Sequence, residues 1–292
     1  MSATAARVLL ATCAEVPDGD DDEQAAIDAL RADGIDAQPS VWDDPDVDWA
    51  ATDLVVVRST WDYTLRREEF LDWARSVPRL ANPASVLAWN TDKTYLRQLA
   101  DAGLPVVPTS WFQPGDEVDD LAPDVVVKPT ISAGAKDTRR HRAGSSARAH
   151  AEQLLNAGRA VMVQPYIDAV DTVGETGLVW LGDRFSHAFR KGALLAAGAD
   201  ATADLYAVEE IGAREPSRAE LATGERVLDV LAELAAAGRA DLLYARVDLV
   251  PDPSGVPVLL ELELTEPSLW FAADPSAVAR WVAAVKGWLA RS

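Results

Sequence analysis

The sequence predicts an α/β protein with a parallel-sheet lobe at its N-terminal end and a mixed sheet toward its C-terminus. Residues 53–58 form an almost continuous apolar run, which is typical of a parallel strand that is covered on both faces. Residues 244–250 and 258–264 are two strand-like runs separated by Pro251 to Gly255, a segment rich in breakers. These two runs are therefore expected to pair as a hairpin.

Residues 1–81 are expected to form a small α/β lobe on the substrate side of the molecule. An acidic turn at 18–22 precedes a helix, and Gly34 suits the position just after the end of that helix. The predicted strands of this lobe are residues 7–12, 37–42 and 53–58. Asn82 and Pro83 then break the chain, so a second domain is predicted to span 82–292.

The second domain is expected to begin with a small lid lobe, over about residues 106–163, and to continue with a larger sheet. A helix at 92–102 precedes the lid, which is predicted to hold strands 106–112, 125–128 and 161–164 and a helix at 147–157. The larger sheet is predicted from residues 175–181, 184–189, 244–250 and 258–264, with helices at 217–237 and 276–290 flanking it.

The composition argues against several classes of protein. About half of the 292 residues are hydrophobic (49%), as in globular proteins, and the net charge of -20 suits neither nucleic acid nor an anionic membrane as a partner. No signal peptide and no run of membrane-spanning length is visible. The single cysteine, Cys13, excludes an intramolecular disulfide and favours a cytoplasmic location. An acidic surface that contains tryptophan is compatible with a homo-oligomer.

Three carboxylates on the predicted hairpin form a candidate metal site. Glu261 and Glu263 project from the same face of their strand because strand side chains alternate, and Asp248 joins them if its register matches. Carboxylates gathered on one surface repel each other unless a cation lies among them. Oxygen ligands of this kind suit Mg²⁺, which often bridges to substrate phosphates, and Mn²⁺ can replace it.

Two lysines upstream of the hairpin are candidate phosphate ligands. Lys128 closes a strand and precedes a loop of small residues, 129–136, where an ammonium group and backbone N–H groups can meet phosphate oxygens. Lys93 is predicted in the first turn of a helix, where its charge opposes the helix dipole unless an anion pairs with it. The plain alternative is that both lysines are solvated.

Other segments add candidate contacts for a nucleotide. Residues 164–168 resemble a hinge between lobes, where backbone groups freed near Pro165 can read an adenine edge and Asp168 can accept ribose hydroxyls. Neither a Walker loop nor a Gly-x-Gly-x-x-Gly fingerprint occurs in the chain. A nucleotide site here is therefore of another type.

Taken in order along the chain, these residues resemble the ATP-grasp superfamily, in the branch of glutathione synthetase and the ribosomal-protein S6 modification ligase. The resemblance rests on Lys93, Lys128, the loop 130–135, the hinge 164–167, the pair Arg246 and Asp248, and the pair Glu261 and Glu263. It covers essentially the whole chain. One departure is that the family often has Asn where Glu263 stands.

The resemblance implies a role for each of these residues. Lys93 and Lys128 would bind phosphates of ATP, and Ser132, Ala133 and Gly134 would belong to a mobile phosphate loop. The adenine pocket would be lined by Gln164, Tyr166 and Ile167. Arg246 would neutralise the transferring phosphoryl group, which makes Arg246 and Lys128 the candidate catalytic residues. Asp248, Glu261 and Glu263 would hold Mg²⁺.

A recognition loop for a small polar substrate is predicted after the strand at 53–58, because ligands of open α/β sheets bind at the carboxyl ends of the strands. Its candidate contacts are Arg58, Ser59, Asp62 and Tyr63. Further along, Arg190 and Lys191 are candidates to face the acceptor, with Glu175 orienting a basic group, and Glu266 to Trp270 are candidates to close the acceptor pocket. Residues 58–63 also resemble ATP-grasp proteins similar to the cyclo-ligase that closes O-ureido-serine to cycloserine.

The expected function is an ATP- and Mg²⁺-dependent ligase that joins a carboxylate to an amine through an acyl-phosphate, on a small amino-acid-like substrate. One alternative is the intramolecular closure of O-ureido-serine to cycloserine. A second is a nucleotide-binding protein without ligase activity, and a third is a kinase that stops at phosphorylation. The sequence leaves open which carboxylate and which amine react.

Overall fold

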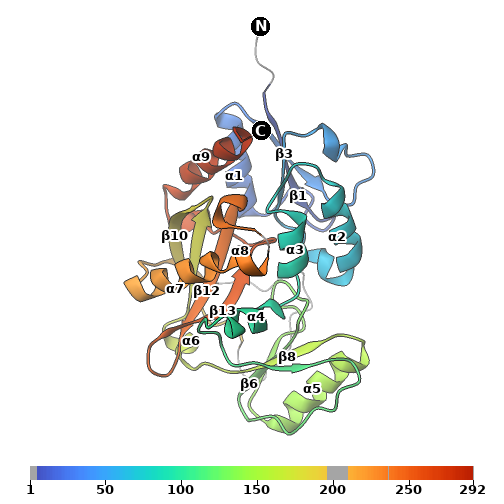
Figure 1. Ribbon diagram of the computed structural model, residues 1–292, viewed down its shortest axis with the longest axis vertical. Helices are drawn as coiled ribbons and strands as arrows, with labels where there is room; N and C mark the ends of the chain where they lie inside the picture. The colour runs from blue at the N-terminus through green and yellow to red at the C-terminus, as the bar shows by residue number, and fades with distance from the viewer. Residues whose placement is uncertain (1–4, 196–209, 236, 292) are drawn as a thin grey trace.

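The computed structural model describes residues 5–195, 210–235 and 237–291. In this part of the chain the strands form three sheets (Figure 1). A four-stranded parallel sheet lies at one end, a five-stranded sheet in the middle and a four-stranded antiparallel sheet at the other end. The α/β class predicted from the sequence is confirmed.

The N-terminal sheet has the order β2-β1-β3-β4, with all pairs parallel. Its strands are β1 (Arg7–Thr12), β2 (Asp36–Val41), β3 (Leu54–Val57) and β4 (Leu80–Ala81). Alternate residues of β3 enter two different clusters, Leu54 and Val56 on one face and Val55 and Val57 on the other. The continuous apolar run therefore reflects burial on both faces, as predicted.

Helices cover both faces of this sheet. On one face α1 (Asp21–Ala32) packs together with α9 (Ala277–Leu289), and on the other lies α2 (Arg67–Ser76). The Asp20 side chain caps the start of α1 by accepting from the Glu23 N–H, and Gly34 follows its end with a φ of +84°. The predicted end of this helix is thus confirmed. The acidic turn that precedes the helix provides its N-terminal cap.

The lid sheet has the order β5-β8-β6-β7 and is antiparallel. Its strands are β5 (Ser110–Phe112), β6 (Val125–Pro129), β7 (Arg139–His141) and β8 (Val161–Pro165), and α5 (Gly144–Asn156) packs on one face. The predicted strand 106–112 is shorter than expected. Val106 makes only an isolated parallel bridge to Leu259 of the next sheet, and Pro108, which has no N–H, separates the two segments.

The central sheet has the order β11-β10-β9-β12-β13. Its strands are β9 (Glu175–Leu181), β10 (Arg184–Lys191), β11 (Ile211–Ala213), β12 (Tyr244–Pro251) and β13 (Pro257–Glu263). All of these pairs are antiparallel, so the sheet expected to be mixed is antiparallel among its described strands, and Val106 adds only an isolated parallel bridge to Leu259. The predicted hairpin is confirmed, with Asp248 opposite Glu261 and Arg246 opposite Glu263.

The other helices show two corrections. The predicted helix at 92–102 is α4 (Tyr95–Asp101), so Lys93 precedes it, and the predicted helix at 217–237 divides into α7 (Arg218–Asp229) and α8 (Leu231–Leu234), with residue 236 outside the described part. The shorter helices are α3 (Ala84–Asn90), α6 (Ala169–Thr172), η1 (Trp49–Ala51), η2 (Trp61–Leu65), η3 (Arg239–Asp241) and η4 (Phe271–Ala273). Among the described residues, no helix is both long and apolar enough to cross a membrane.

Candidate active site

A cavity of about 500 Å³ is lined by residues of all three sheets and their loops. Tyr63 reaches it from the N-terminal lobe, Lys128 from the lid sheet, and Glu261 and Glu263 from the central hairpin. Its volume falls in the range of small-molecule and cofactor sites. The cavity brings together residues that are far apart in the sequence, as the resemblance implied.

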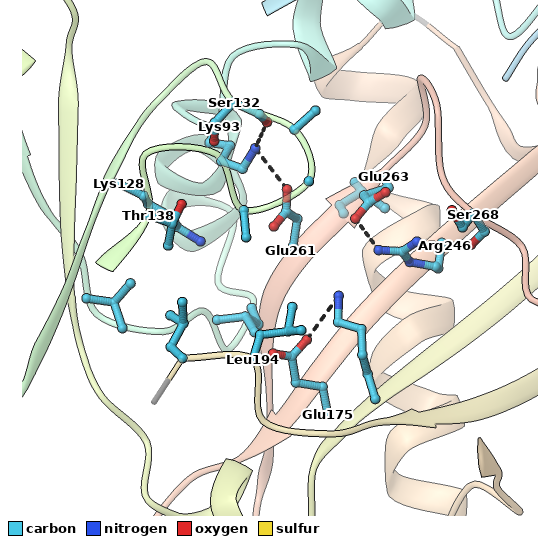
Figure 2. A pocket seen from close by; sticks show the side chains of 18 of the residues that line it. Lys93, Lys128, Ser132, Thr138, Glu175, Leu194, Arg246, Glu261, Glu263 and Ser268 are labelled. Atoms are coloured by element: carbon cyan, nitrogen blue, oxygen red, sulfur yellow. Dashed lines mark hydrogen bonds and ion pairs between the residues drawn. The ribbon is translucent and has the colours of Figure 1, made fainter. Parts of the chain in front are cut away.

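Four cationic side chains surround the carboxylates of this cavity. Lys93 and Lys128 lie on the lid side, and Lys191 and Arg246 extend from β10 and β12. In Figure 2 the ammonium group of Lys93 points at Glu261, and the guanidinium group of Arg246 points at Glu263. Positive and negative side chains therefore lie next to each other on the cavity wall. The positive ones can bind an anionic ligand, and the negative ones can bind a cation that accompanies it.

Lys93 is held in place by its backbone and by its side chain. Its N–H donates to the Thr130 carbonyl at 2.8 Å, and its ammonium group donates to the Ser132 carbonyl at 2.5 Å and pairs with Glu261 at 3.0 Å. Although burial opposes a charge here, the Glu261 carboxylate raises the pKa of Lys93. Lys93 thus ties the small-residue loop of the lid to the central hairpin.

Lys128 has the opposite electrostatic environment. Burial lowers its pKa, and the neighbouring charges of Lys93 and Lys191 lower it further, while Glu261 opposes both effects. Three ammonium groups gathered around one buried wall repel each other, and an anionic ligand would relieve that repulsion. The arrangement therefore favours binding of phosphate oxygens in this part of the cavity.

The three predicted metal ligands do not have the same exposure. Glu261 and Glu263 line the cavity, whereas Asp248 is only 2% exposed and receives a bidentate contact from Arg246, at 2.9 and 2.8 Å. Among the described residues no group of three or more His, Cys, Asp or Glu side chains is arranged to hold a metal ion. The metal-binding role of Asp248, Glu261 and Glu263 remains a prediction.

Two cavity carboxylates still fit Mg²⁺, because this ion is usually bound by one or two carboxylates together with substrate phosphates and water. Burial raises the pKa of Glu263, and the negative charges of Asp248 and Glu261 raise it further, against the effect of Arg246. The cations Lys93 and Lys128 instead lower the pKa of Glu261, against the effect of burial. A divalent cation beside Glu263 would offset the crowding of negative charge.

The hinge places most of its predicted residues on the cavity. Gln164, Tyr166 and Ile167 line it, and the Gln164 amide donates to the Thr109 hydroxyl at 3.0 Å. Asp168 does not line the cavity. Its side chain is exposed and pairs with Arg140 at 3.5 Å. Its contact with ribose remains a prediction that this geometry does not favour.

The small-residue loop of the lid also borders the cavity. Ser132, Ala133 and Gly134 line it, together with Thr138 (Figure 2). Gly134, Ala135 and Asp137 have φ values of +58°, +59° and +56°. Because such angles are rare for residues other than Gly, the loop has an irregular path that aims backbone groups in several directions.

The predicted recognition loop of the N-terminal lobe is divided. Tyr63 lines the cavity, but Arg58, Ser59 and Asp62 do not. Arg58 is 3% exposed and lies 3.7 Å from Asp22, and Asp62 accepts from the Trp42 indole at 2.9 Å. Direct substrate contacts by these three residues remain predictions, and their present contacts are internal to the protein.

Strand β10 presents Lys191 to the cavity, whereas Arg190 donates to the Val173 carbonyl at 2.8 Å and does not line it. Glu175 lies opposite Lys191 in the sheet and pairs with it at 3.4 Å, so a basic group is oriented by Glu175 as expected. Because side chains alternate along a strand, the sequence could have predicted that only one of Arg190 and Lys191 faces the cavity. Glu175 and Lys191 are an opposite-charge cross-strand pair, whereas Arg190 faces the other side.

Other cavity residues gave no clear signal in the sequence. Asp20, Asp21 and Asp22 line the cavity from the start of α1, although their pattern is that of an ordinary helix cap and first turn. Asp22 accepts the N–H groups of Leu269, Trp270 and Phe271, at 3.0, 3.0 and 2.6 Å. The acidic turn therefore anchors the loop after β13, a contact between residues about 250 positions apart.

Solved structures of other proteins share this fold. A RimK-domain ATP-grasp protein from Sphaerobacter thermophilus matches with a TM-score of 0.66 at 19% identity, covering 96% of this chain and 98% of its own. A D-alanine–D-alanine ligase from Bacillus anthracis matches with a TM-score of 0.65 at 13% identity, covering 98% of each chain. The fold is that of these ATP-grasp structures.

Closer relatives define the family. A family model described as the N-terminal domain of D-cycloserine synthetase DcsG matches residues 8–82. The cycloserine biosynthesis protein DcsG of Streptomyces lavendulae is 36% identical over 266 residues, which are 86% of this chain and 88% of that protein. A crystal structure of D-cycloserine synthetase DcsG matches with a TM-score of 0.85 at 32% identity, covering 97% and 99% of the two chains.

The chain belongs to the DcsG family of ATP-grasp ligases, and it is an enzyme that forms C–N bonds. The resemblance drawn from the ordered lysines, arginine and carboxylates is thereby confirmed. ATP-grasp ligases in general use ATP and Mg²⁺, and the cavity supplies cations and carboxylates suited to both.

Proposed function

We propose that the protein is an ATP- and Mg²⁺-dependent cyclo-ligase that closes an O-ureido-serine-like amino acid to a cycloserine-type ring. One observation supports this best. Four cations and several carboxylates, among them Glu261 and Glu263, line a single cavity in a chain that is 36% identical to a cycloserine biosynthesis protein. This function narrows the carboxylate–amine ligation expected from the sequence to a reaction within one molecule.

The proposed reaction has two steps. The substrate carboxylate first attacks the γ-phosphate of ATP, which gives an acyl-phosphate and ADP. The oxygen-bound nitrogen of the same substrate then attacks the acyl carbon, and inorganic phosphate leaves. This nitrogen still carries the carbamoyl group of the ureido substituent, which water then removes as CO2 and ammonia to give the ring N–H of cycloserine. Without phosphorylation, the carboxylate would have to lose one of its oxygens as oxide or hydroxide, which leaves poorly. In the acyl-phosphate the same oxygen leaves as part of phosphate, which is a good leaving group.

The residues of the cavity suit the first step. Lys93, Lys128 and Arg246 would stabilise negative charge on the phosphates, and groups fixed in advance by the fold do so without reorganisation. Mg²⁺ held by Glu261 and Glu263 would supply further charge neutralisation at the phosphates. The lid sheet would cover the acyl-phosphate, which water would otherwise hydrolyse.

The test measures ADP and cycloserine formation from ATP and the enantiomers of O-ureido-serine. ADP release with stoichiometric cycloserine from the substrate alone is the expected result. ADP release only after a separate amine is added would replace cyclisation by ligation between two molecules. Binding of ATP without turnover on any amino acid would favour the nucleotide-binding alternative.

Lys128→Ala is expected to lower kcat for ADP formation by at least about 100-fold, because it removes a buried charge from the phosphate side of the cavity. The matched control is Lys286→Ala. Lys286 is an exposed lysine that pairs with Asp33 on the outer face of the N-terminal lobe, so this change should leave turnover unaltered. Equal turnover of wild type and Lys128→Ala would remove Lys128 from the mechanism.

A further inference from the structure

Glu266 is a carboxyl group on the cavity that the steps above leave without a role. It lies in the loop between β13 and η4, three residues after Glu263, and it lines the cavity. Glu261, Glu263 and Glu175 each pair with a cation, namely Lys93, Arg246 and Lys191. Glu266 instead has a neutral hydroxyl near it, that of Tyr63, which also lines the cavity.

Tyr63 comes from the opposite lobe and is held firmly. Its side chain is 3% exposed, and its ring stacks on Phe70 with a centroid distance of 5.1 Å. It lies in η2, the next element after β3, and it too lines the cavity. Tyr63 and Glu266 thus reach the same cavity from the N-terminal lobe and from the loop after β13, and the Tyr63 hydroxyl acts on the pKa of Glu266.

The charges that face Glu266 come from several elements. Lys93, ahead of α4, and Arg246 of β12 are positive, and Glu261 of β13 is negative, while the hydroxyl of Tyr63 is neutral. Burial raises the pKa of Glu266 to about 7, with Glu261 adding to this effect and Lys93, Tyr63 and Arg246 opposing it. A carboxyl group with such a pKa can gain and lose a proton near neutral pH.

We propose that Glu266 is the catalytic base that accepts the proton of the attacking nitrogen during ring closure, and that Tyr63 is its positioning residue. This inference rests on the proposed cyclo-ligase function. It assigns Glu266 to the second step of the reaction, after the acyl-phosphate has formed, and so separates it from the groups that serve ATP.

The step balances as follows in atoms and electrons. The nitrogen lone pair forms the bond to the acyl carbon, and the bond from that carbon to the phosphate oxygen breaks. Phosphate leaves with the electron pair of this bond, and the proton from nitrogen passes to the Glu266 carboxylate. The ring nitrogen keeps its carbamoyl group through this step, and hydrolysis by water afterwards releases that group as CO2 and ammonia. No oxidant or reductant is involved, and water later removes the proton from Glu266.

The experiment compares Glu266→Gln with wild type in two measurements made on the whole enzyme. Positional isotope exchange within the βγ-bridge of labelled ATP reports reversible formation of the acyl-phosphate, and cycloserine formation reports ring closure. Glu266→Gln should retain the exchange and lose cycloserine formation by about 100- to 10,000-fold, the usual range for a general base. Glu225→Gln, an exposed carboxyl on α7, is the matched control that should change neither.

The pH profile gives an independent readout that a structural role would not produce. The rate of ring closure in wild type should rise with pH through the pKa of Glu266, and Glu266→Gln should lose this acidic limb. Because the Tyr63 hydroxyl lowers the pKa of Glu266, Tyr63→Phe should move the limb to higher pH while keeping it. Tyr63→Phe retains the ring that stacks on Phe70, so it also serves if Glu266→Gln folds poorly.

Two results would overturn the assignment. Wild-type cycloserine formation in Glu266→Gln would show that another group or water takes the proton. A parallel loss of isotope exchange and cycloserine would place Glu266 in the first step or in the scaffold. A wild-type enzyme with neither exchange nor product would instead contradict the proposed function itself, and the inference about Glu266 would fall with it.

Discussion

At the scale of single residues, the N-terminal lobe buries a chain of polar groups at the carboxyl ends of β1 and β3. The Thr12 and Ser59 hydroxyls lie 2.7 Å apart, and Ser59 donates to Glu23 Oε2 at 2.7 Å. Glu23 is 1% exposed, and its other carboxylate oxygen has no hydrogen-bond partner in the described structure. Arg58 lies next to this group and contacts the rings of Tyr244 and Trp281.

Burial of Glu23 should make the stability of the protein depend on pH. Burial raises the pKa of Glu23 to about 7, against the effects of Arg58 and Ser59. A carboxyl group whose pKa is higher in the folded than in the unfolded state stabilises the fold at low pH. This contribution is complete below the unfolded value and declines as the pH rises through about 7.

Replacing Glu23 by Gln should therefore flatten the pH dependence of stability. We expect the loss of unfolding free energy between about pH 5 and pH 8 to be smaller by about 2 kcal/mol in Glu23→Gln than in wild type. Urea unfolding at the two pH values measures this difference, with Glu225→Gln as the exposed control. The same slope in Glu23→Gln and wild type would mean that Glu23 does not titrate in this range.

At the scale of elements, Arg140 of β7 binds together the parts that form the hinge. It makes a bidentate contact with Asp124, at 2.6 and 2.8 Å, and pairs with Asp171 of α6 at 3.3 Å. Its guanidinium group stacks on the Tyr166 ring at 3.2 Å, and the Tyr166 hydroxyl donates to Asp171 at 2.5 Å. The lid sheet, the hinge and α6 are thus connected through one side chain.

Arg140→Ala should weaken both the lid and the nucleotide site. Loss of the charged hydrogen bonds is expected to cost about 1–3 kcal/mol of stability, and a looser Tyr166 should raise KM for ATP by about tenfold. Thermal unfolding and steady-state kinetics measure the two effects. Arg148→Ala breaks an exposed helical ion pair with Glu152 and should leave stability almost unchanged. An unchanged KM in Arg140→Ala would show that Tyr166 does not depend on this contact.

At the scale of the whole molecule, two asparagines join the N-terminal half to the central sheet. The Asn82 amide donates to the Tyr244 and Leu264 carbonyls, at 2.9 and 2.7 Å, and its oxygen accepts from the Leu243 N–H at 2.8 Å. Asn90 makes similar contacts with Leu262 and Leu264. The predicted domain boundary at Asn82 is thus a buried junction, and the two sides are held by hydrogen bonds.

Two variants of Asn82 should separate the contribution of its side-chain hydrogen bonds to stability from the contribution of its backbone conformation. Asn82 has a φ of +58°, which Gly adopts readily and Ala does not. Both Asn82→Ala and Asn82→Gly leave three buried backbone groups without partners, for an expected loss of about 3 kcal/mol. Asn82→Ala should lose about 1 kcal/mol more because of its backbone angle. Urea unfolding measures both, and equal stability of the two variants would contradict the conformational contribution.

Much of this protein could be predicted from the sequence because the signals were local. The two-residue period of β13 placed Glu261 and Glu263 on one face, and the breakers at 251–255 predicted the hairpin that brought Asp248 opposite Glu261. The continuous apolar run of β3 predicted a parallel strand covered on both faces. The family followed from the order of charged residues along the chain, which needs no knowledge of their positions in space.

Only the tertiary structure decided which charged side chains face the cavity and which are buried in contact with charged side chains of opposite sign. Asp248 and Arg58 carry the same charges in the sequence as Glu261 and Lys93, yet Asp248 is neutralised by Arg246, and Arg58 is enclosed beside Glu23 and Asp22. The carboxyl of Glu266 acquires its pKa from groups on three distant segments. The sequence determines what chemistry is available, whereas distances and exclusion of water, which depend on packing across the whole chain, determine where that chemistry is used.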